Sequence, residues 1–193
     1  MSNTIRILPM GRIIAALFAL LLTAGTVQAK DLAVAYLDNI NSSATAQMLR
    51  HILEFNTDYK VTLKKTTIAD MWSGVAEGRY DGAMSVLLPD QASFMEQYAG
   101  KVEDLGPNWI GPNFTMHTIV RKGYERDDVE IVRFLNNYCL CGERLSSAVA
   151  MNADGVITDQ EARSWIDENG PWVTNMMGFT RPFDDREERY VTY

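Results

Sequence analysis

The chain is poor in the residues that most catalytic and metal sites need, with two cysteines and two histidines in 193 residues. Two histidines with no spacing relation to the cysteines do not make a structural zinc site, which takes about four ligands. The sequence also contains no glycine-rich phosphate loop and no serine, cysteine and histidine pattern of a catalytic triad. We therefore expect neither an enzyme nor a protein with a metal or another cofactor.

Basic charge is scarce as well, because 18 Lys and Arg face 25 Asp and Glu, for a net charge of −7. Nucleic acids and anionic lipid surfaces both bind basic surfaces. An acidic chain of this kind argues against either as the partner. A small molecule or another protein remains as the expected partner.

Long hydrophobic runs are missing, since the longest, Ile13–Leu22, falls short of the roughly 20 residues of a membrane-spanning helix. This run follows Arg6 and Arg12 and precedes small residues at 27–29, which is the pattern of a secretory signal peptide. We expect cleavage after Ala29 and export to the periplasm. Because the removed segment carries two basic residues and no acidic ones, the exported chain becomes more acidic still.

From residue 31 onward the hydrophobic pattern alternates between strands and helices. The predicted strands are 32–36, 59–63, 82–88, 102–105 and 114–120, and helices are predicted after the first three. Segment 106–112 holds two glycines and two prolines, so we expect a turn-rich loop there. The β-α-β-α-β-α order predicts an α/β fold with a mostly parallel sheet flanked by helices.

The last third of the chain changes character, because after Lys122 the pattern predicts helices alone, at 128–138 and 158–169. We expect residues 30–179 to form a single domain, since this length suffices for one hydrophobic core and not for two ordinary domains. Residues 180–193 are mostly charged and are expected to fray.

Several single residues allow specific expectations. Trp72 and Trp165 fall on the apolar faces of predicted helices and are expected in the core, whereas His51 is expected at the surface. Cys139 and Cys141 are separated by one residue. They are open to four interpretations: ordinary packing, a redox-labile pair bridged to each other, a disulfide to another molecule, or contact with a soft metal.

Segment 150–161 resembles a calcium-binding EF-hand loop, with Gly155 at the sixth position and Glu161 at the twelfth. Its first ligand position, however, is Ala150, which has no oxygen to offer. The same residues also fit a turn followed by a helix that Thr158 and Glu161 open as a capping box. Calcium binding through this loop is therefore one alternative function.

The stretch Met71–Tyr98, MWSGVAEGRYDGAMSVLLPDQASFMEQY, followed by KVEDLGPN, resembles the first lobe of the periplasmic glycine betaine/choline-binding proteins of ABC transporters. That lobe has a Trp-containing helix, a strand that ends in Pro and a Tyr-containing helix in this order. The segment Gly155–Ile166 resembles the end of the same proteins. The resemblance runs from about Leu32 to Trp172 and implies one lobe of a periplasmic binding protein type fold.

The resemblance also shows two departures. Proteins of this family have a second lobe inserted in the first, but here the first-lobe pattern reaches the closing strand 114–120 directly, which leaves no room for it. The family places caging tryptophans before the Pro of the third strand and after the first strand, where this chain has Leu87 and the turn Leu37–Asn39. Losing two aromatic faces costs on the order of 1–4 kcal/mol of binding free energy for a quaternary ammonium ion.

We expect the ligand surface at the carboxyl ends of the parallel strands, as in open α/β sheets generally. The candidate binding residues, chosen by this position, are Tyr36, Asp38, Asn39, Ser42, Pro89, Asp90 and Trp109. The predicted function is that of an exported solute-binding component, or a remnant of one, of a glycine betaine/choline-type ABC system. It binds a small polar or quaternary ammonium solute without catalysis, and an ABC permease is its expected partner. The alternative is a one-lobed interaction module that has lost solute binding and contacts another protein or a second copy of itself.

Overall fold

The computed structural model describes residues 30–110 and 112–178; the predicted signal peptide and charged tail lie outside this part of the chain. Its strands are β1 (Lys30–Leu37), β2 (Tyr59–Thr66), β3 (Gly82–Leu88), β4 (Val102–Ile110) and β5 (Thr115–Arg121). Its helices are α2 (Ile40–Asn56), α3 (Ile68–Ala76), α4 (Ala92–Gln97), α5 (Tyr124–Asp127), α6 (Val129–Asn137), α7 (Glu143–Met151), α8 (Asp159–Glu168) and α9 (Gly170–Met176).

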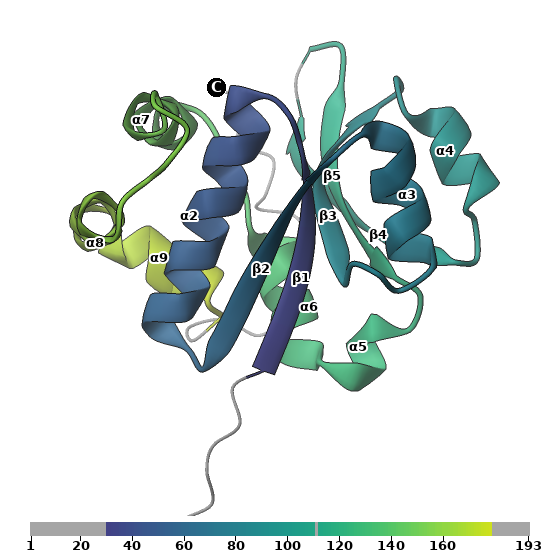
Figure 1. The fold of residues 1–193 in the computed structure, drawn as a ribbon, viewed down its shortest axis with the longest axis horizontal. Coiled ribbons are helices and arrows are strands. Elements are labelled where there is room, and N and C mark those ends of the chain that lie inside the picture. The colour runs from purple at the N-terminus through teal and green to yellow at the C-terminus, as the bar shows by residue number, and fades with distance from the viewer. Residues whose placement is uncertain (1–29, 111, 179–193) are drawn as a thin grey trace, which may run out of the picture.

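The strands form one five-stranded sheet in the order β2-β1-β3-β5-β4 (Figure 1). β1 pairs in parallel with β2 and β3, whereas β5 pairs antiparallel with both β3 and β4. Four strands therefore run in one direction and β5 runs against them. The predicted α/β fold with helices around a sheet is confirmed, and the predicted strand 114–120 corresponds to β5, which lies in the same sheet as the first three strands.

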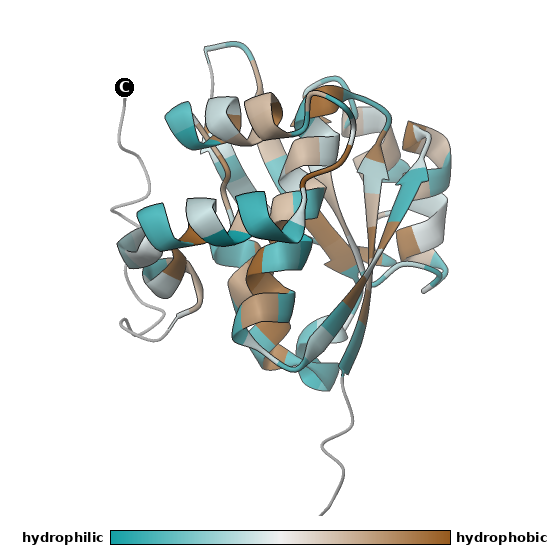
Figure 2. Cartoon of the chain, turned by 60° about the vertical axis from the view of Figure 1, so that its left-hand side comes forward, coloured by the Kyte–Doolittle hydropathy of each residue, from teal (hydrophilic) through white to brown (hydrophobic). Residues whose placement is uncertain are grey.

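Helices cover both faces of the sheet, and a hydrophobic core lies on each face (Figure 1). One core joins the sheet to α2 and the C-terminal helices and contains Trp165; the other joins it to α3 and α4 and contains Trp72. Both tryptophans are buried, as expected. Figure 2 shows the hydrophobic residues running along the central strands. Within residues 30–110 and 112–178, no helix is long and apolar enough to cross a membrane.

The prediction of a loop at 106–112 is wrong for residues 106–110, because β4 continues to Ile110. The pairing of β4 with β5 shifts register on both sides of Pro107, and Gly106 has a φ of +93°. β4 is an edge strand, so its outer side needs no partner and an irregular stretch with proline is tolerated there. Glycine and proline thus mark bulges in an edge strand here.

The expectation that His51 lies at the surface is also wrong, because its side chain is 2% exposed. Its Nε2 atom lies 2.9 Å from the carbonyl oxygen of Ile157. Its Nδ1 atom has no hydrogen-bond partner among the described residues and lies 3.5 Å from a carboxylate oxygen of Asp159. His51 therefore ties α2 to the start of α8. Burial lowers the pKa of His51.

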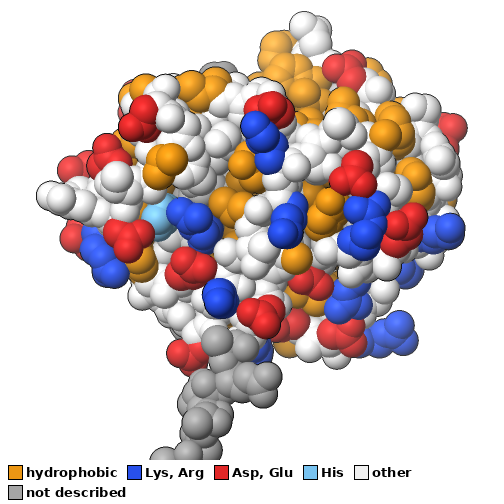
Figure 3. Space-filling view, viewed as in Figure 1, with side chains coloured by type: hydrophobic (Ala, Val, Ile, Leu, Met, Phe, Trp, Pro, Cys, Tyr) orange, Lys and Arg blue, Asp and Glu red, His pale blue; other side chains and the backbone are white. Residues whose placement is uncertain are grey.

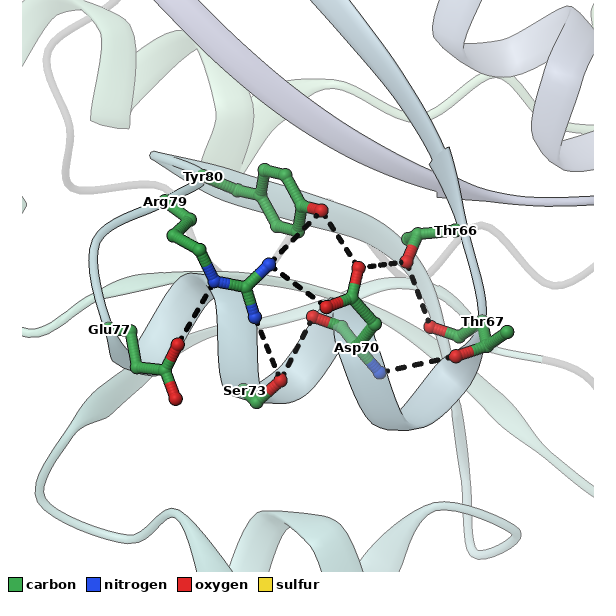
Figure 4. Close-up of polar contacts among 7 residues, drawn as sticks. All are labelled: Thr66, Thr67, Asp70, Ser73, Glu77, Arg79 and Tyr80. Carbon is green, nitrogen blue, oxygen red and sulfur yellow. Dashed lines mark hydrogen bonds and ion pairs between the residues drawn. The ribbon is translucent and has the colours of Figure 1, made fainter.

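A polar network covers the outer side of α3, and Asp70 is its centre (Figure 4). The carboxylate of Asp70 accepts hydrogen bonds from Thr66 at 2.6 Å and Tyr80 at 2.8 Å, and pairs with Arg79 at 2.9 Å. These bonds, that of Thr66 first, lower the pKa of Asp70. The ring of Tyr80 reaches this position because Gly74 leaves room for it, and a Cβ at Gly74 would overlap the ring.

The buried His51 makes stability depend on pH. Because the pKa of His51 is lowered by folding, the unfolded chain takes up the proton more readily, so the free energy of unfolding falls as the pH drops below about 6.5. We expect the thermal midpoint to decrease between about pH 7.5 and 5.5. The variant His51→Gln, which keeps a donor for Ile157, should show a smaller decrease. Equal decreases in the two proteins would contradict this account.

The contact between Gly74 and Tyr80 predicts that Gly74→Ala displaces the Tyr80 ring. The expected cost is about 1–3 kcal/mol in the free energy of unfolding, measured by urea denaturation, because an added methyl group overpacks this contact. Gly170→Ala is the matched control, since a Cβ there meets nothing within 4 Å. That variant should differ from the parent by less than about 0.5 kcal/mol. Equal stability of both variants would count against the packing argument.

Candidate functional site

The carboxyl ends of β1, β3 and β4 meet at one edge of the sheet, which we call the carboxyl edge. β4 reaches this edge because it runs antiparallel to β5, which itself runs antiparallel to β3. The edge also holds the starts of β5 and of the helices α2, α3 and α4, which follow β1, β2 and β3 in the chain. This is where open α/β sheets bind their ligands.

An open hollow of about 460 Å³ lies at the carboxyl edge between the end of β3 and the start of β5. Its lining residues are Leu88, Pro89, Ala92, Asn113, Phe114 and Thr115. Of the predicted binding residues, Pro89 lines this hollow. Asp90 follows it directly and is exposed.

Two aromatic rings stand together at this edge, one at the end of β4 and one just before β5. The ring centroids of Trp109 and Phe114 are 4.8 Å apart, with 50° between the ring planes. Trp109 is one of the predicted binding residues, and Phe114, which also lines the hollow, is a residue that the sequence reasoning missed. The pair could have been predicted from the sequence, because Trp109 and Phe114 lie on the two sides of the turn between neighbouring antiparallel strands.

The candidates in the first turn are engaged in forming that turn. Asn39 caps α2 by accepting a hydrogen bond from the backbone N–H of Ser42 at 2.9 Å. The hydroxyl oxygen of Ser42 accepts one from the backbone N–H of Leu37 at 3.0 Å, and Ser42 is buried. These side chains shape the backbone of the edge.

The remaining candidates, Tyr36 and Asp38, lie at and just after the end of β1. Asp38 pairs with Lys65 at 3.2 Å, and both side chains are well exposed. Tyr36 is half-buried near the end of β1, where it pairs with Lys65 of β2. Of the predicted binding residues, Pro89 thus lines the hollow, and Trp109 contacts Phe114, which lines it too. The polar residues of the first turn, 36–42, do not line the hollow.

Figure 3 shows hydrophobic side chains gathered at the top of the molecule, over the tip of β4 and β5 in Figure 1. Ile110 is 50% exposed and Phe114 is 38% exposed. Ile40 at the start of α2 and Ile68 at the start of α3 are exposed as well. The carboxyl edge is therefore apolar as well as hollowed, which is typical of surfaces that bind a ligand or a partner.

A chain of three polar side chains runs beneath this edge, from β4 to the hollow. The Nδ1 atom of His117 lies 2.8 Å from a carboxylate oxygen of Asp104, and its Nε2 atom lies 2.8 Å from the hydroxyl oxygen of Thr115. His117 is buried. The sequence reasoning missed this group because Asp104 and His117 come from different strands. Their bonds fix the position of the Thr115 hydroxyl at the hollow.

The calcium alternative finds no support in the geometry of loop 150–161. Asn152 is buried and accepts a hydrogen bond from Gln47 at 2.6 Å, while Glu161 forms the predicted capping box with Thr158. Asp154 accepts a hydrogen bond from the backbone N–H of Val156. Among the described residues, no group of three His, Cys, Asp or Glu side chains is placed to hold a metal ion.

The sequence matches no protein-family model. Over 54 residues, which are 28% of this chain, it is 41% identical to the glycine betaine/carnitine transport binding protein of Listeria monocytogenes. That match spans 18% of the length of the Listeria protein. The sequence similarity is thus local. The matched protein is a transport binding protein for glycine betaine and carnitine, which is the kind of protein that the motifs resemble.

The fold is similar to that of several solved binding proteins. Lactococcal OpuAC, in its closed form with glycine betaine, gives a TM-score of 0.68 at 14% identity, over 77% of this chain and 99% of that chain. The glycine betaine/L-proline-binding protein of Borrelia burgdorferi gives 0.65 at 14% identity over the same shares. An ABC-transporter choline-binding protein with choline gives 0.64 at 12% identity, over 75% and 92%. The resemblance inferred from the sequence is confirmed, and the fold is of the periplasmic binding protein type.

The Asp104–His117–Thr115 group predicts that Asp104→Ala destabilises the edge. Removing the carboxylate leaves the buried imidazole N–H of His117 without its acceptor, which costs about 1–3 kcal/mol in the free energy of unfolding. The neighbouring acid supplies the control, because Glu103 pairs with Lys122 at 3.7 Å near the surface. Glu103→Ala should cost less than about 1 kcal/mol in the same urea titration. A cost for Asp104→Ala no larger than the control would refute the role given to this bond.

Proposed function

We propose that this chain is an exported solute-binding component of a glycine betaine/choline-type ABC transport system. It binds a small quaternary ammonium or similarly polar solute at the carboxyl edge and carries out no chemistry on it. The observation that carries the proposal is the Trp109–Phe114 pair beside the open hollow, on a fold shared with binding proteins for such solutes.

The chemistry of the edge suits a quaternary ammonium ion. Such an ion has no N–H to donate, so it is held by aromatic faces, each of which contributes about 0.5–2 kcal/mol. Trp109 and Phe114 offer two faces at the edge, and the exposed carboxylate of Asp90, directly after Pro89, favours a positively charged group there. Because the hollow is open on one side, we expect weak binding, with a Kd on the order of a millimolar.

The Asp104–His117–Thr115 group has the order of a nucleophilic triad, yet its surroundings support a binding role. Thr115 stands opposite Leu88 in β3 and Ile110 in β4. These three residues take part in the sheet pairing, whereas an oxyanion hole requires free N–H donors that point at the reacting atom. The group serves to hold the hydroxyl in place.

The proposal includes the organisation of the whole protein. Residues 1–29 act as a signal peptide that directs the chain to the periplasm, residues 30–179 act as a single lobe, and an ABC permease receives the solute. Support comes from the α/β domain formed by the described residues and from the transport binding proteins that share its fold.

A second candidate is an interaction module that binds a protein in place of a solute. The exposed Ile40, Ile110 and Phe114 at the carboxyl edge favour it, because a single lobe leaves this apolar edge uncovered. A second copy of the chain or a two-lobed partner would cover the same surface. The two functions differ in whether the edge binds a small solute with a quaternary ammonium group.

Calorimetric titration with glycine betaine, choline and carnitine tests the proposed function. We expect measurable heat at millimolar ligand, and we expect Trp109→Ala to weaken binding about tenfold because one aromatic face is lost. Trp172→Phe is the control, since Trp172 packs against Trp165 and lies away from the edge. That variant should bind as the parent does.

No heat at millimolar concentrations of any of the three solutes would contradict solute binding. If the mass by light scattering then rises with protein concentration, the interaction module replaces it as the function. A heat signal that survives Trp109→Ala unchanged would retain solute binding but exclude the aromatic pair as its site.

A further inference from the structure

The two cysteines of the chain form a bridge in the segment between α6 and α7. The Cα atoms of Cys139 and Cys141 are 5.6 Å apart, and the two residues are joined as a disulfide. Both are partly exposed. The structure thus assigns the pair to one of the interpretations left open by the sequence, a bridge within the chain.

This bridge contributes little to holding the fold together. A disulfide stabilises a protein mainly by closing a loop, and the effect grows with the length of that loop; here the loop contains Leu140 alone. Other contacts anchor the segment, because Leu140 is fully buried and the Tyr138 hydroxyl donates a hydrogen bond to the carbonyl oxygen of Thr45 at 2.8 Å. The Asn108 amide also donates one to the carbonyl oxygen of Tyr138 at 2.7 Å.

The bridge lies at the surface of the described part of the chain. Cys139 and Cys141 are partly exposed, and a side chain at position 142, directly after the bridge, would meet no atom within 4 Å. Cys141 also immediately precedes the N-cap of α7, where the helix end favours a thiolate. The helix end therefore makes Cys141 the better leaving group of the two. After Cys141 has taken up its proton, its thiol can donate a hydrogen bond to the carbonyl oxygen of Asn108, which lies 4.0 Å from the sulfur.

We propose that the Cys139–Cys141 bridge is a thiol–disulfide exchange site that accepts two electrons from a dithiol of another protein. A thiolate of that protein attacks Sγ of Cys139, the bond between Cys139 and Cys141 breaks, and Cys141 leaves as a thiolate. The second thiolate of the dithiol then attacks its own first sulfur in the mixed disulfide, and Cys139 leaves. The other protein ends with a disulfide, and its two protons end on Cys139 and Cys141.

This activity is separate from solute binding, because the bridge lies in the segment between α6 and α7 and the hollow lies between β3 and β5. The acceptor of electrons is the protein's own disulfide, so a single turnover needs no further oxidant. Repeated turnover needs a small-molecule disulfide that reoxidises the pair.

The test uses the full chain with its bridge formed and a short peptide that carries two thiols as the electron donor. We expect one peptide disulfide per chain, formed about tenfold faster than with oxidised glutathione at equal concentration, because the leaving thiolate is favoured here. Cys141→Ser should trap a mixed disulfide through Cys139 when it is mixed with the oxidised peptide. The thermal midpoint should stay unchanged when the bridge is reduced.

The double variant Cys139→Ser with Cys141→Ser is the control and should oxidise no peptide while it melts at the same temperature as the parent. A rate equal to or below that of oxidised glutathione would overturn the proposal. A bridge that is reduced only when the protein unfolds, or a double variant with a much lower thermal midpoint, would show a structural bridge and would overturn it as well.

Discussion

The position of β5 between β3 and β4 is the constraint on which the rest of the structure depends. Because β5 runs antiparallel to both neighbours, β4 ends at the same edge as β1 and β3. That edge consequently carries the hollow, the Trp109–Phe114 pair and the exposed apolar residues. If β4 ran in the opposite direction, Trp109 would lie at the far end of the sheet from Pro89.

Side chains from β4 connect this edge to the rest of the molecule. Asn108 bonds with Thr118 in the neighbouring strand and with the backbone of Leu135 and Tyr138. Asp104 bonds with His117. These contacts compensate for the register shifts around Pro107, which interrupt the regular ladder of the strand. An irregular edge strand is thereby held in one position, as the proposed binding surface requires.

The fold was predictable from the sequence where the pattern is local. Hydrophobic periodicity gave the first three strands and α2 and α3, and the capping box gave the start of α8. The end of β4 was not predictable, because glycine and proline mark loops and edge bulges alike. The burial of His51 and the bond between Asp104 and His117 were not predictable either, since both depend on elements distant in the sequence.

The central claim is the proposal that the carboxyl edge binds a small solute with a quaternary ammonium group. The most direct test is to record the backbone amide NMR spectrum while glycine betaine is added. The account predicts shift changes confined to the ends of β1, β3 and β4 and the start of β5, with the largest at Trp109 and residues 113–115. Shift changes centred on α7, α8 and α9, or none at saturating solute, would contradict it.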